Sequence, residues 1–234
     1  MFPSAPIIFE RSGIIAVPDI YDEAAAFMKG EICRIGGLSL TQRALDFCAF
    51  PCAARLADIG CGKGATVRCL REAGFEAFGL DSDPGAIAHA GPHCHSGNAL
   101  NLPYAEADMD GVFFECSLSQ MENPLMALTE ARRVLKPSGY LIISDLYSRN
   151  DSYPQNGSVQ LKAPPNRRSW EEQCGAAGFS CLLFEDKSEE LKTLISQLLW
   201  QYGSSIFKKL CAYDEAALKA ARCGYFLLIA QKER

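Results

Sequence analysis

One acidic residue, Asp58, and three closely spaced glycines lie in one short segment, LADIGCGKGATV, at residues 56–67. The segment predicts a strand, a glycine-rich turn at Gly60, Gly62 and Gly64, and then a helix. Glycine lets the backbone approach a ligand closely, and the start of the helix presents free N–H groups. Asp81 lies 21 residues after Gly60, where the next strand is expected to end. This pattern predicts that a nucleotide-type ligand binds at the turn.

Two ligands fit these residues. Gly60, Gly62 and Ala65 satisfy the dinucleotide fingerprint, with Asp81 as the ribose-binding acid. Asp58, however, precedes the first glycine by two residues, where its charge would repel a pyrophosphate but attract an ammonium group. S-adenosylmethionine carries an ammonium, a sulfonium and a ribose, and no phosphate. It is therefore the favoured cofactor, while a dinucleotide, or a capping role for Asp58, stays open.

The ordered motifs of residues 55–147 resemble the class I S-adenosylmethionine-dependent methyltransferases. Residues 58–64 (DIGCGKG) resemble their first motif, and residues 79–82 (GLDS) resemble their second acidic strand end. Residues 97–104 (GNALNLPY) resemble the stretch that contacts adenine. The segment from Asp110 to Asp145 resembles the strand–helix–strand that follows. The likeness is strongest to the ubiquinone/menaquinone-biosynthesis branch, which acts on small molecules, although Asn98 stands where the family often has Asp and Ser138 replaces a usual glycine.

The resemblance implies a set of cofactor-binding residues and an approach for the methyl acceptor beyond the fourth and fifth strands. Methyl transfer is an in-line displacement, so that positioning matters more than a dedicated base. Glu115 and Asp145 are nonetheless candidate bases, and Tyr147, Tyr21 and Phe27 are candidates to line or cover the acceptor site. The predicted cofactor-binding residues are Asp58, Gly60, Cys61, Gly62, Gly64, Asp81, Ser82, Asn98, Ala99, Leu100, Glu115 and Cys116.

Strand-like and helix-like segments alternate from Arg55 onward, which predicts an α/β fold. We expect a Rossmann-like, doubly wound, seven-stranded and mostly parallel sheet with helices on both faces. We also expect one domain over residues 1–234, with an N-terminal helical cap (1–50), a cofactor-binding core (55–147) and a substrate-side part (148–234) with a helical insertion before the last strand. The expected strands are 55–59, 75–80, 93–96, 110–115, 140–144, 179–184 and 225–230, and the expected helices are 21–29, 41–47, 65–73, 84–90, 123–135, 170–177 and 191–202.

The three histidines cluster with a cysteine at His89, His93, Cys94 and His95, which are metal-ligand residue types. Because side chains alternate along a strand, a single strand cannot aim all of them at one ion, and we expect no metal. The sequence has 11 Cys and no apolar segment of the length that a membrane helix requires. A disulfide framework is therefore less favoured than reduced thiols in the cytoplasm.

The net charge of -5 argues against a nucleic-acid partner. The expected partner is a small-molecule acceptor, and the apolar stripe of residues 191–202 is either a packed helix, a lid or a homodimer surface. Two other functions stay open. A nicotinamide-dependent oxidoreductase would bind a dinucleotide at the same turn, and a non-catalytic partner subunit would bind the cofactor without turnover.

Overall fold

A computed structural model describes residues 35–152, 164–202 and 215–233. Its core is a seven-stranded sheet in the order β3-β2-β1-β4-β5-β7-β6. The first five strands pair in parallel, and β7 is antiparallel to both β5 and β6. The strands are β1 (Arg55–Ile59), β2 (Glu76–Asp81), β3 (Cys94–Ser96), β4 (Met109–Glu115), β5 (Leu135–Tyr147), β6 (Phe179–Asp186) and β7 (Gly224–Lys232).

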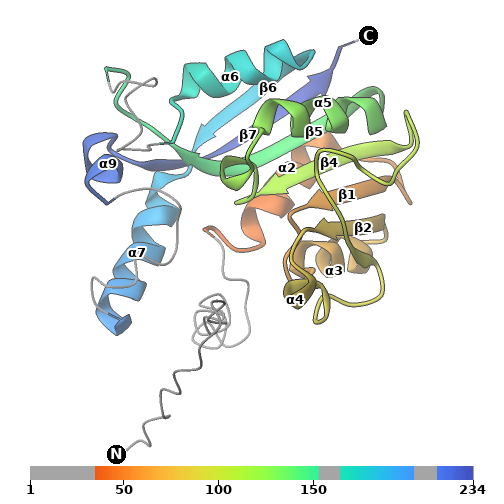
Figure 1. The fold of residues 1–234 in the computed structure, drawn as a ribbon, viewed down its shortest axis with the longest axis horizontal. Coiled ribbons are helices and arrows are strands. Elements are labelled where there is room, and N and C mark those ends of the chain that lie inside the picture. Colours follow the sequence, from red (N-terminus) through yellow and green to blue (C-terminus); the bar gives the residue numbers. More distant parts are fainter. Residues whose placement is uncertain (1–34, 153–163, 203–214, 234) are drawn as a thin grey trace, which may run out of the picture.

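Helices cover both faces of this sheet (Figure 1). On one face, α5 and α6 bury apolar side chains against Ile59, Phe114 and Ile143. On the other, α2 and α3 pack on Leu56 and Phe113. The doubly wound, seven-stranded α/β fold expected from the sequence is thus confirmed. The helices are α2 (Ser39–Cys48), α3 (Ala65–Glu72), α4 (Pro84–Ile87), α5 (Pro124–Val134), α6 (Arg167–Ala176), α7 (Ser188–Tyr202) and α9 (Glu215–Ala220), with a 3-10 turn η1 (Leu118–Gln120).

Local capping explains several element boundaries. The side chain of Asn123 accepts a hydrogen bond from the Met126 amide (3.1 Å) and begins α5 where the sequence predicts it. Asn166 accepts one from the Ser169 amide (2.9 Å), so that α6 begins at Arg167, three residues earlier than predicted. Because an Asn side chain satisfies an otherwise unpaired N–H of the first turn, it fixes where a helix starts.

Three further differences from the sequence expectation concern β5, α7 and α9. β5 already begins at Leu135, because Leu135 pairs with Met109 of β4. The register then shifts, and regular pairing continues from Gly111 and Tyr140 onward. The spacing of Asp186 and Glu189 in the sequence would allow a capping box at the start of α7. In the structure Asp186 accepts hydrogen bonds from Ser188 instead, and Glu189 pairs with Lys192. The sequence did not predict α9.

Residues 21–29, including Tyr21 and Phe27, lie outside the described residues. Of the expected N-terminal cap, α2 is described, and it buries Leu40, Ala44 and Leu45. Among the helices that the structure describes, none has the length and apolar character needed to cross a bilayer.

Candidate cofactor site

The glycine turn lies at the carboxyl edge of the sheet, between β1 and α3. Gly60, Gly62 and Gly64 all have positive φ, at 80°, 52° and 72°. A side chain at Gly60 would also collide with that of Ser117, whose hydroxyl donates a hydrogen bond to the Ile59 carbonyl (2.7 Å). Glycine is therefore required at residue 60 by both backbone conformation and space.

Asp81 ends β2 beside this turn. Its Oδ2 accepts a hydrogen bond from the Gly62 amide (2.8 Å), and its Oδ1 accepts one from the Asp83 amide (2.9 Å). The carboxylate thus lies at the mouth of the glycine turn, as the sequence predicts for a ribose-facing acid. The adjoining Ser82 is exposed.

The predicted adenine-side segment follows β3 and lies next to Asp81. The Gly97 amide donates to the Asp81 carbonyl (2.9 Å). Asn98 is exposed, and its side-chain oxygen accepts a hydrogen bond from the Leu100 amide (2.9 Å). In this structure that oxygen stabilises the local turn, while Ala99 and Leu100 pack against the apolar core.

Two carboxyl groups lie under the turn on the same face of the sheet. Asp58 in β1 is 2% exposed and is the register partner of Phe113 in β4. Glu115 is two residues beyond Phe113, so that its side chain and that of Asp58 point to the same face. Glu115 is 8% exposed. This pair makes the site strongly acidic, which favours a cationic group.

Two threonines hold Glu115 in place. Thr41 Oγ1 in α2 donates to Glu115 Oε1 (2.9 Å), and Thr66 Oγ1 in α3 donates to Glu115 Oε2 (2.6 Å). Neither threonine is among the site residues expected from the sequence. Thr66 could have been noticed because it lies two residues after Gly64, whereas no local signal identifies Thr41, which is 74 residues from Glu115.

Cys116 adopts a left-handed backbone conformation, with φ 56°, directly after β4. Its sulfur lies 2.7 Å from the hydroxyl oxygen of Tyr225, and that hydroxyl donates to Ser144 Oγ (3.2 Å). Tyr225 is fully buried. This contact connects the ends of β4, β5 and β7 on the side where the acceptor is expected, and Tyr225 was also missed from the sequence.

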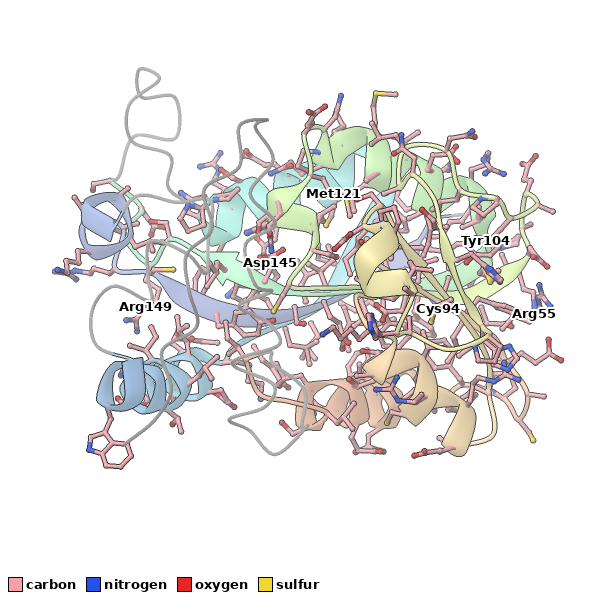
Figure 2. All side chains as sticks on the ribbon, turned by 60° about the horizontal axis from the view of Figure 1, so that its bottom comes forward. Arg55, Cys94, Tyr104, Met121, Asp145 and Arg149 are labelled. Carbon is pink, nitrogen blue, oxygen red and sulfur yellow. The ribbon has the colours of Figure 1, made fainter. Side chains whose placement is uncertain are left out.

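Asp145, a candidate base in the sequence, is enclosed. It is 1% exposed, and it accepts hydrogen bonds from the Ser119 hydroxyl (2.6 Å), the Ser119 amide (2.9 Å) and the Leu146 amide (2.7 Å). Burial raises the pKa of Asp145 to about 6, although these hydrogen bonds act to lower it. In the view of Figure 2, Asp145 lies between Cys94 and Arg149. Its surroundings favour a structural role in holding the turn after β4.

Tyr147, expected near the acceptor, is buried in the core. Its ring packs edge-to-face on Phe184 and Phe226, with centroids 5.3 Å and 5.8 Å away. In the part of the chain that the structure describes, no group of three or more histidine, cysteine or acidic side chains is placed to hold a metal ion. His89 instead lies 3.0 Å from the Gly85 carbonyl through Nδ1.

The sheet order and the acidic glycine turn define the class: a Rossmann-like α/β protein with a nucleotide-type cofactor site at its carboxyl edge. A methyltransferase domain model matches residues 57–143. This match identifies residues 57–143 as similar to the class I S-adenosylmethionine-dependent methyltransferases, in the branch of the enzymes of quinone biosynthesis.

The relatives support this assignment. Malonyl-[acyl-carrier protein] O-methyltransferase of Hahella chejuensis is 32% identical over 107 residues, which is 42% of this chain and 38% of that protein. Demethylmenaquinone methyltransferase of Renibacterium salmoninarum is 29% identical over 96 residues, which is 39% of this chain and 40% of that protein. The aligned region thus spans less than half of either relative.

Among solved structures, a putative sarcosine dimethylglycine methyltransferase from Galdieria sulphuraria superimposes with a TM-score of 0.68 and 16% identity, over 92% of this chain and 99% of that one. At that identity the likeness establishes the fold alone.

Proposed function

We propose that this protein transfers the methyl group of S-adenosylmethionine to a small-molecule acceptor. The observation that carries the proposal is the pair of buried carboxyl groups, Asp58 and Glu115, on one face beneath the glycine turn. An acidic site suits the ammonium of the cofactor and disfavours a pyrophosphate. The cofactor supplies the activated methyl group, and the protein supplies its position.

Each part of the site has a role in this proposal. Asp58 and Glu115 hold the ammonium end, and Asp81 accepts hydrogen bonds from the ribose hydroxyls. Gly60, Cys61, Gly62 and Gly64 let the backbone approach the cofactor. Ser82 extends the ribose side, while Asn98, Ala99 and Leu100 border the adenine. Cys116 lies on the methyl side, and no general base is assigned.

Several expectations belong to the same proposal. One domain comprises the whole chain, and the acceptor approaches beyond β4 and β5. The many cysteines favour a reducing cytoplasmic setting. A homodimer through α7 stays a prediction.

Calorimetry with S-adenosylhomocysteine tests the proposal. We expect binding by the folded protein, and a loss of affinity of about tenfold or more in Asp58→Asn and Asp81→Asn, as for charge-assisted hydrogen bonds. Glu172→Gln is the matched control, because Glu172 is exposed on α6 and forms an ion pair with Arg168 there. Thermal protection by NAD(H) without any by S-adenosylhomocysteine would instead favour the oxidoreductase.

A further inference from the structure

A pair of cysteine side chains lies directly beneath the glycine turn. Cys61 belongs to the turn itself and is 8% exposed, while Cys94 begins β3 and is 5% exposed. They come from opposite sides of β2: the Cys61 amide donates to the Leu80 carbonyl (3.1 Å), and Cys94 is the register partner of Gly79.

The position of Gly79 shows how close the two sulfurs are. A Cβ added at Gly79 would lie 2.7 Å from the sulfur of Cys61 and 2.7 Å from that of Cys94. The two sulfurs therefore lie no more than twice that distance apart. A glycine inside a strand often marks such a close approach. Residue 79 must be glycine in this arrangement, because the two sulfurs occupy the space that a Cβ would need.

The two thiols have different chemistry. The neighbouring Cys61 lowers the pKa of Cys94, although burial acts in the opposite direction. The neighbouring Cys94, together with burial and the nearby Asp58, raises the pKa of Cys61. A thiolate is the reactive form of cysteine, so that Cys94 is the expected nucleophile and Cys61 its resolving partner.

We propose that Cys61 and Cys94 form an oxidisable dithiol that cross-links the cofactor turn to β3 when a peroxide reaches it. The Cys94 thiolate attacks one oxygen of hydrogen peroxide, which breaks the O–O bond and releases hydroxide, leaving a sulfenic acid. The Cys61 thiol then displaces the sulfenic oxygen, which takes up the thiol proton and leaves as water. The hydroxide takes up the proton that Cys94 lost on forming its thiolate, so that the two thiols lose two electrons in total and the peroxide is reduced to two molecules of water.

The turn offers a route for a molecule as small as peroxide. Gly62 is partly exposed, and the space where its side chain would point is open. A disulfide requires an S–S length of about 2.05 Å, so bond formation draws Cys61 toward β3. Because Cys61 lies between Gly60 and Gly62, this movement displaces the turn. The oxidised protein therefore binds the cofactor more weakly, a consequence that rests on the proposed function.

The chain contains a comparison pair in Cys174 of α6 and Cys181 of β6. The neighbouring Cys174 likewise lowers the pKa of Cys181, but these thiols lie near the opposite edge of the sheet, with Cys181 exposed. The double variant Cys174→Ser/Cys181→Ser removes this second pair and leaves the turn intact. Cys94→Ser removes the proposed dithiol while keeping Cys61.

The experiment treats the reduced, full-length chain with hydrogen peroxide and maps disulfides by peptide mass spectrometry. We expect a Cys61–Cys94 cross-link, reversed by dithiothreitol, in the wild type and in Cys174→Ser/Cys181→Ser. S-adenosylhomocysteine affinity should fall by about tenfold on oxidation, within the usual range of coupling between sites. Saturating S-adenosylhomocysteine should slow the cross-link, because such coupling is reciprocal. Peroxide should leave the affinity of Cys94→Ser unchanged.

Two results would overturn the proposal. One is the absence of a Cys61–Cys94 cross-link under conditions that oxidise Cys181, and the other is a cross-link that leaves cofactor affinity unchanged. If the reduced protein fails to bind S-adenosylhomocysteine at all, the proposed function fails, while the mapped disulfide still decides whether the dithiol exists.

Discussion

Thr66 donates a 2.6 Å hydrogen bond from its hydroxyl to Oε2 of Glu115, and so joins the helix after the glycine turn to the end of β4. Both side chains are buried, with Thr66 4% and Glu115 8% exposed. The carboxyl group that faces the proposed ammonium site is thus positioned by the same helix whose start forms the glycine turn. Any change in this contact affects the turn and the acidic site together.

Thr66→Val keeps the shape of the side chain and removes the hydroxyl. Because a buried carboxyl group then loses a hydrogen-bond donor, the free energy of unfolding should fall by about 1–3 kcal/mol. Denaturant unfolding measures this loss, and calorimetry should show weaker S-adenosylhomocysteine binding. Thr129→Val is the control, since the Thr129 hydroxyl donates to the Leu125 carbonyl on an exposed part of α5. Its effect should stay within about 0.5 kcal/mol. Equal effects of the two variants would contradict the prediction.

Gly60→Ala should destabilise the protein and impair cofactor binding, because residue 60 has φ 80° and its added methyl group would collide with Ser117. Backbone strain of this kind costs about 1–3 kcal/mol. Gly175→Ala provides the contrast, since it lies in α6 with open space at its Cβ position. That control should raise stability by about 0.5–1 kcal/mol. Thermal unfolding with and without S-adenosylhomocysteine measures the effects of Gly60→Ala and Gly175→Ala. A Gly60→Ala variant as stable as the wild type would refute the steric argument.

Asp145 should make stability fall as pH rises. Its pKa is raised to about 6 from an ordinary value of 3.8, so that between these values the folded state holds a proton that the unfolded state has lost. The free energy of unfolding of the wild type, relative to Asp145→Asn, should therefore decrease by about 3 kcal/mol from pH 3.8 to above pH 6. Urea unfolding of both proteins across this range measures the difference.

The pKa of Asp186 is shifted in the opposite direction from that of Asp145. Burial acts to raise its pKa, but hydrogen bonds from Ser188 and the nearby Tyr147 and Arg149 together outweigh that effect and lower it below 3.8. The ionised Asp186 therefore contributes to the free energy of unfolding above pH 3.8, and this contribution is lost as the pH falls through the lowered pKa. Asp186→Asn should therefore show a nearly constant difference from the wild type between pH 4 and pH 6. A flat profile for Asp145→Asn as well would show that Asp145 is not protonated in the folded protein.

Tyr225→Phe removes the hydroxyl that contacts Cys116 and Ser144 while retaining the buried ring. The expected loss in unfolding free energy is about 1–2 kcal/mol, as for a buried hydrogen bond. A double-mutant cycle with Ser144→Ala isolates the Tyr225–Ser144 bond, and the coupling should be about 0.5 kcal/mol or more. Strict additivity of the two substitutions would mean that this bond contributes nothing measurable.

The sequence determined the fold class and the position of the glycine turn. Strands end at Ile59, Asp81 and Glu115, and parallel strands bring such ends to one edge, where Asp81 accepts a hydrogen bond from the Gly62 amide. These features depend on local patterns of apolar residues, glycines and strand ends, which a sequence displays directly.

Only the tertiary structure decided what surrounds each candidate side chain. Glu115 bonds to Thr41, 74 residues away, Asp145 is enclosed by the turn at Ser119, and the sulfurs of Cys61 and Cys94 meet above Gly79. These contacts arise where helices pack on the sheet and where neighbouring strands align in register. Local periodicity does not encode which distant side chains meet, because that depends on how the packed elements fill space together.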